Sequence, residues 1–210
     1  MAGAVTALRG SLEAAGLSGL ALDAVSGAII AFAVLAAVPA FGFLVDRARW
    51  YVSKAVASAF GQKAAFFLMN YATFPGVITH ELSHALVAKL SGCRINSIKL
   101  FEPSGSTLGS VQFTCQGSKR RQSFQMAASS CAPVLCGMAL TPAIWRFAGM
   151  FHGAVLQAML FHFSVSVACH MTMSRMDMRS YRKGAIGLFL RLAPVCLCVS
   201  YAFGRGSFGG

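Results

Sequence analysis

Long apolar runs separated by short polar segments dominate the pattern of hydrophobic positions along the chain. A helix needs about 20 apolar residues to cross the hydrocarbon core of a bilayer, and several of the runs reach or approach that length. We therefore expect an all-α polytopic membrane protein with about four to six transmembrane helices. The apolar runs cover residues 24–45, 64–90, 124–145, 150–171 and 184–203.

Proline and glycine divide the second of these runs. Pro75-Gly76 interrupts it, and Pro is well tolerated in the first turn of a helix. We expect one helix to end near Phe74 and another to begin at Pro75. Gly92 then supplies a stop signal for this second helix.

Two short stretches alternate apolar and polar residues as strands do. Residues 94–101 and 110–115 lie on either side of a Pro and Gly turn signal, which predicts a small β-hairpin at the membrane surface over about residues 94–115. Residues 46–63 mix cations with aromatic residues, which suits an amphipathic helix in the interface or the beginning of the next span.

The pattern predicts a chain with one main domain. Residues 1–23 are weakly polar and are expected to form an N-terminal surface segment, and residues 24–203 a single membrane-embedded domain. The Gly-rich tail, residues 204–210, is expected to be disordered.

Composition strengthens the membrane interpretation. Hydrophobic residues make up 56% of the chain and charged residues only 11%, whereas a soluble domain carries about 25% charged residues. The net charge of +12 comes from cations between the apolar runs, where they favour an anionic lipid surface over nucleic acid. We expect an integral, multi-pass membrane protein, in the plasma or inner membrane if the source is bacterial.

The seven cysteines show no spacing typical of a metal site. Cys93 and Cys115 lie at the two ends of the polar hairpin segment and are the candidates for a disulfide. The odd total favours free thiols.

The strongest chemical signal is the sequence His80-Glu81-Leu82-Ser83-His84. Residues four apart lie on one face of a helix, so the two imidazoles can bind one Zn²⁺ ion and leave room for a further protein ligand and a water. Glu81 lies beside the metal, where it can take a proton from zinc-activated water and pass it to the leaving amine.

The sequence offers few candidates for the third ligand. Asp177 is the best, because it follows an apolar run on the side that the His84 end of its helix approaches. Ser174-x-x-Asp177 also resembles a capping box, and the two roles are compatible. His170 is a candidate for a supporting role or a packed core histidine, and Glu102 is expected at the surface. His152 and His162 lie among bulky apolar residues, so we expect them to pack between helices.

Residues 74–113 resemble the site-2 protease family of intramembrane metalloproteases, particularly its short members that lack a PDZ domain. In that family a His-Glu-x-x-His helix ends in a Gly, a β-hairpin follows, and a later span supplies an Asp. The resemblance implies that His80 and His84 bind zinc and that Glu81 is the catalytic base. Residues 170–178, HMTMSRMDM, are similar in position to the family's Asn-x-x-Pro…Asp-Gly motif, with Asp177 at its Asp. The prolines are missing here, Met178 replaces the Gly, and His170 stands near the Asn.

These observations lead to one functional hypothesis and two alternatives. The hypothesis is an intramembrane zinc metalloendopeptidase that cleaves membrane proteins or peptides in or near their spanning segments, in contact with the bilayer and without nucleic acid. The first alternative is an inactive zinc-binding pseudoprotease or scaffold. The second is a metal or proton transporter that uses the same polar groups as a relay.

Overall fold

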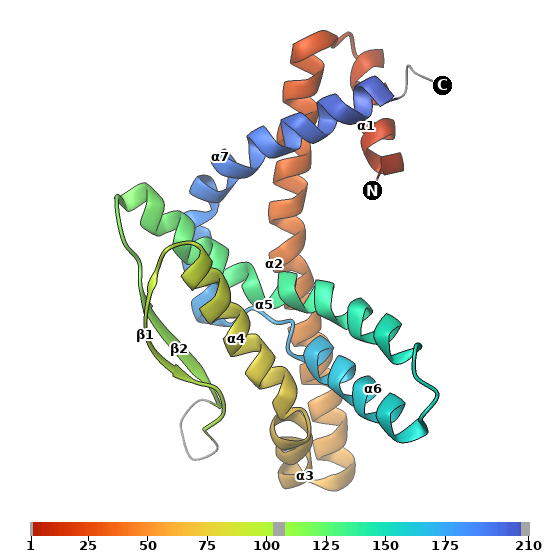
Figure 1. Ribbon diagram of the computed structural model, residues 1–210, viewed down its shortest axis with the longest axis vertical. Coiled ribbons are helices and arrows are strands. Elements are labelled where there is room, and N and C mark those ends of the chain that lie inside the picture. Colours follow the sequence, from red (N-terminus) through yellow and green to blue (C-terminus); the bar gives the residue numbers. More distant parts are fainter. Residues whose placement is uncertain (1, 103–107, 207–210) are drawn as a thin grey trace. The chain divides into compact units, whose positions relative to one another are not determined.

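Helices make up most of the computed structural model, which describes residues 2–102 and 108–206 (Figure 1). This confirms the predicted helical class with a small hairpin. In chain order the elements are α1 (Ala2–Ala14), α2 (Gly19–Phe60), α3 (Gln62–Phe66), the π-helix η1 (Phe67–Ala72), α4 (Phe74–Leu90), β1 (Arg94–Lys99), β2 (Ser110–Thr114), α5 (Lys119–Ala148), α6 (Ala154–Cys169) and α7 (Arg175–Gly206).

Three helices among the described residues are long and apolar enough to cross a membrane, namely α2, α5 and α7. Helix α6 is equally apolar but has only 16 residues. Residues 46–60 continue α2 without a break, and α7 extends to Gly206, into the segment predicted as a tail. Residues 207–210 of that tail lie outside the described part of the chain.

The chain forms two compact units, Met1–Ala37 with Ala185–Gly210, and Val38–Gly184. In the first unit, a buried polar cluster links α1, α2 and α7. The guanidinium of Arg9 forms an ion pair with Asp23 and donates hydrogen bonds to the carbonyl and hydroxyl oxygens of Ser200, at 3.0 and 2.9 Å. Ser26 and Ser200 share a further hydrogen bond. Paired in this way, the buried charges avoid the full cost of desolvation.

In the second unit, α4 packs against α5 and α6 through small residues, which allow close approach of the helices. Gly76 is the extreme case: a Cβ there would lie 2.0 Å from the carbonyl oxygen of Ser166 on α6. The predicted boundary is confirmed, since α4 begins at Phe74 with Pro75 in its first turn. The buried small residues of α4 and α5 include Ala85, Ala88, Cys131 and Ala132.

The hairpin lies alongside α4 in Figure 1, and both of its strands contact that helix. Its strands pair antiparallel from Arg94↔Thr114 to Lys99↔Ser110, with an irregularity between Ile95 and Ser97. Gly92, with φ of 90°, provides the left-handed turn from α4 into β1.

The base of the hairpin is held by a fully buried glutamine. The side chain of Gln125 on α5 donates to the carbonyl of Ser91 at 2.9 Å and accepts from the backbone N–H of Gln116 at 3.0 Å. Beside it, Cys93 and Cys115 are free thiols with their Sγ atoms 3.7 Å apart. Burial, followed by the hydrogen bond to Cys93, raises the pKa of Cys115 to about 11.

Candidate metal centre and active site

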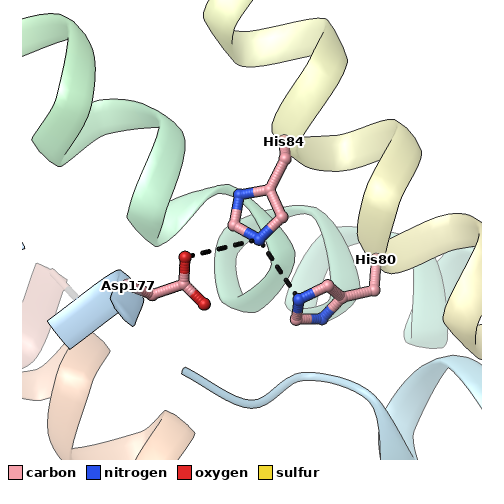
Figure 2. Close-up of side chains that lie close together, drawn as sticks. All are labelled: His80, His84 and Asp177. Carbon is pink, nitrogen blue, oxygen red and sulfur yellow. Dashed lines mark hydrogen bonds and ion pairs between the residues drawn. The ribbon is translucent and has the colours of Figure 1, made fainter. Parts of the chain in front are cut away.

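Helix α4 presents the two histidines of the motif on one face. Their ring centroids are 4.8 Å apart, and the Nε2 atoms of His80 and His84 are 3.2 Å apart (Figure 2). This is the arrangement that the spacing of four residues predicts, because such residues lie one turn apart on the same side of a helix.

Backbone carbonyls orient both rings. Nδ1 of His80 donates to the carbonyl of His170 at 2.8 Å, and Nδ1 of His84 donates to the carbonyl of Ser129 at 2.8 Å. Since a carbonyl oxygen only accepts, each ring carries its proton on Nδ1 and keeps the lone pair of Nε2 free. Hydrogen bonds of this kind fix the tautomer and the orientation of a metal-ligating histidine.

Asp177 approaches the same point from the first turn of α7. Its Oδ1 lies 3.6 Å from Nε2 of His84 (Figure 2). Its Oδ2 accepts from the backbone N–H of Ser174 at 3.0 Å, and the Ser174 hydroxyl accepts from the backbone N–H of Asp177 at 3.1 Å. Asp177 therefore takes part in a capping box with one carboxylate oxygen and faces the histidines with the other.

The three side chains can hold a metal ion. One ligand atom from each of His80, His84 and Asp177 lies within 4.8 Å of the others. Nitrogen ligands about 2.05 Å from a tetrahedral zinc are about 3.3 Å apart, close to the 3.2 Å between the two Nε2 atoms. Two free imidazole lone pairs and a carboxylate oxygen are a donor set that suits zinc.

Glu81 lies beside this cluster in a cavity of about 180 Å³. Leu108 and Gly109, just before β2, line one side of the cavity. A Cβ on Gly109 would lie 2.7 Å from Cγ of Glu81. Only a glycine allows this close approach of the hairpin backbone to the carboxylate. Arg49, His80, Glu81 and His170 are among the residues that line the cavity.

The other candidate residues have different outcomes. His170 is buried and lines the cavity, and its backbone carbonyl orients His80. Glu102 is part-exposed and forms an ion pair with Lys99 at 2.8 Å, as expected of a surface residue. His152 and His162 are both exposed, so the expectation that they pack between helices is wrong. Apolar neighbours in the sequence indicate a lipid-facing side as readily as a packed one.

Two contributors to the site are not evident from the sequence. Ser129 acts through its backbone carbonyl, and since every residue has one, the sequence does not single out Ser129. Arg49 belongs to a group of interfacial cations, and nothing in the spacing of that group distinguishes it from Arg47.

Comparison with known proteins identifies one relationship. A family model described as Peptidase M50B-like matches residues 51–177. No curated protein and no solved structure matches the chain. The match covers more than half of the chain and includes His80, Glu81, His84 and Asp177, so the chain belongs to the Peptidase M50B-like family, within the site-2 proteases.

Proposed function

We propose that this protein is a multi-pass intramembrane zinc metalloendopeptidase. The observation that carries the proposal is the convergence of two Nε2 lone pairs and a carboxylate oxygen, from His80, His84 and Asp177, beside the carboxylate of Glu81. The family match to peptidases and the three candidate spans support the same assignment.

Each residue of the site has a defined task in this proposal. His80, His84 and Asp177 would hold the zinc, which when bound would act as a Lewis acid toward water and the substrate carbonyl. Glu81 takes a proton from the attacking water and delivers it to the leaving amine. The carbonyls of His170 and Ser129 keep the two imidazoles in the ligating orientation.

We further propose that the substrate is an apolar, locally unwound membrane segment. A transmembrane helix uses its own carbonyls in internal hydrogen bonds, so it must unwind before cleavage. The free edge of β1 offers backbone partners for an added strand. Ile95 and Ile98 of β1 also line an apolar groove of about 560 Å³ together with Leu82 and Leu86 of α4. Charge substitutions in β1 that leave cleavage intact would remove support for this step.

The test combines metal content with cleavage in proteoliposomes. Purified wild type is expected to bind one zinc per chain, and His84→Ala and Asp177→Ala to lose it, by inductively coupled plasma mass spectrometry. Wild type is expected to cleave a reconstituted single-span peptide, detected by mass spectrometry. Glu81→Gln is expected to keep the zinc and lose cleavage.

The same measurements separate the alternatives. A scaffold would keep its zinc and cleave nothing in any form. A transporter would move zinc into the liposomes, and the rate of this zinc flux would not depend on whether the protein cleaves peptides. Zinc-dependent cleavage that survives Glu81→Gln would refute the assigned role of Glu81.

A further inference from the structure

The cavity beside Glu81 contains a cation without a carboxylate partner. Arg49 of α2 lines the cavity together with His80 and Glu81. Its guanidinium donates one long hydrogen bond, at 3.5 Å, to the carbonyl of Met69. Within residues 2–102 and 108–206, no carboxylate forms an ion pair with it, and Asp46, three residues earlier, is exposed.

An unpaired cation in this position is costly. Arg49 is part-buried beside the cavity, and a part-buried cation loses hydration that only a partner of opposite charge replaces in full. Its planar set of five donors matches a carboxylate in a two-point hydrogen bond, which a lysine cannot reproduce. The cost is offset when a carboxylate enters the cavity.

A second group in the cavity also lacks a partner. Nδ1 of the buried His170 donates to the carbonyl of Ser166 at 2.9 Å, which leaves Nε2 as an acceptor in the neutral ring. That Nε2 is buried and has no hydrogen-bond partner among the described residues. Arg49 and His170 are therefore two polar side chains lining one cavity whose hydrogen-bonding capacity the described residues do not fill.

We propose that Arg49 is a specificity determinant that binds a carboxylate of the substrate next to the scissile bond. This inference rests on the proposed function. A cavity of about 180 Å³ is small, and one extended residue spans about 3.3 Å, so the carboxylate belongs to one of the one or two residues next to the cut. It is either an acidic side chain in an intact segment, which keeps the endopeptidase assignment, or the C-terminal carboxylate of a segment already cut, in which case the enzyme removes the last one or two residues as a carboxypeptidase.

Four peptides with the same apolar segment distinguish these sources. One pair has Glu or Gln at the position next to the cut, and the other pair ends there in a free carboxylate or an amide. The wild type is expected to cleave one carboxylate peptide with a kcat/KM about 10- to 100-fold above its neutral partner, mainly through KM. Equal kcat/KM values within both pairs would overturn the proposal without any variant.

Variants then assign the preference to Arg49. Arg49→Gln is expected to abolish the preference, so that kcat/KM becomes equal within each pair, and Arg49→Lys to restore it in part. Arg47→Gln is the matched control, because Arg47 lies on the same helix, is exposed and stacks on Phe43 instead of lining the cavity. A preference that persists in Arg49→Gln, or that is lost equally in Arg47→Gln, would overturn the proposal.

A binding measurement keeps this inference separate from the proposed function. Zinc-loaded Glu81→Gln is expected to bind the preferred carboxylate peptide about 10- to 100-fold more tightly than the neutral one, and Glu81→Gln/Arg49→Gln to bind both equally. If the wild type cleaves none of the peptides but this binding difference appears, the proteolytic function fails and the carboxylate site stands. If cleavage occurs with no binding difference, the carboxylate site fails and the proteolytic function stands.

Discussion

Gly76 is the position where a single added methyl group should disturb both the fold and the metal centre. In Gly76→Ala the new Cβ would lie 2.0 Å from the carbonyl oxygen of Ser166 and 2.5 Å from Nδ1 of His170. A carbon and an oxygen in contact need more than about 3 Å, so α4 must move away from α6 by about 1 Å. The hydrogen bond from Nδ1 of His80 to the carbonyl of His170, now 2.8 Å, would then exceed hydrogen-bonding distance.

The expected loss combines two terms. Overpacking costs about 1–3 kcal/mol, and a lost hydrogen bond about 1 kcal/mol more, so the free energy of unfolding should fall by about 2–4 kcal/mol. The thermal midpoint in detergent should fall by about 5–10 °C. Because His80 loses the carbonyl that orients it, the zinc affinity should fall about 10- to 100-fold.

Gly149→Ala is the matched control, since Gly149 has φ of -66° and a Cβ there makes only ordinary contacts, at 3.5 and 3.9 Å. Both variants would be measured by thermal unfolding and by competition for zinc with a chelator. If Gly76→Ala keeps the stability and zinc affinity of Gly149→Ala, the close approach of α4 to α6 does not support the metal centre and the reasoning is wrong.

Three further predictions concern the surroundings of the site. Ser174→Ala removes a helix cap and should cost about 1 kcal/mol of stability in denaturant titration, with the zinc stoichiometry retained. Asp177→Ala, in contrast, should lose zinc, and equal zinc loss in both variants would contradict the assigned ligand. Gln125→Leu removes two part-buried hydrogen bonds to the backbone and should cost about 1–3 kcal/mol in the same titration. A stability equal to that of the wild type would exclude its role at the base of the hairpin. The thiolate is the reactive form of Cys115, whose pKa is raised to about 11. Alkylation of the native protein, followed by mass spectrometry, should therefore accelerate about tenfold per pH unit from about pH 8 to 10; a rate that levels off near pH 9 would contradict the raised pKa.

The sequence alone determined the local features of this protein. The lengths of the apolar runs predict the helical membrane class, and the alternation in residues 94–101 and 110–115 predicts the hairpin. The spacing of His80 and His84 predicts their shared face. Each of these depends on the period of one helix or strand, which neighbouring residues fix without reference to the rest of the chain.

The tertiary structure decided what meets these local features across the chain. Asp177 is 93 positions after His84, and only the packing of α4, α5 and α6 and the start of α7 bring the two together. The contact of the Ser129 carbonyl with His84 follows from the same packing, and the position of Arg49 in the cavity follows from the placement of its own helix, α2. Every residue has a backbone carbonyl, so residue type does not indicate which carbonyl will orient a ligand. A cation beside an apolar run looks the same in the sequence whether it faces lipid headgroups or a cavity. Sequence therefore gives the chemistry that each element carries, and the packing of the helices decides which of those groups act together.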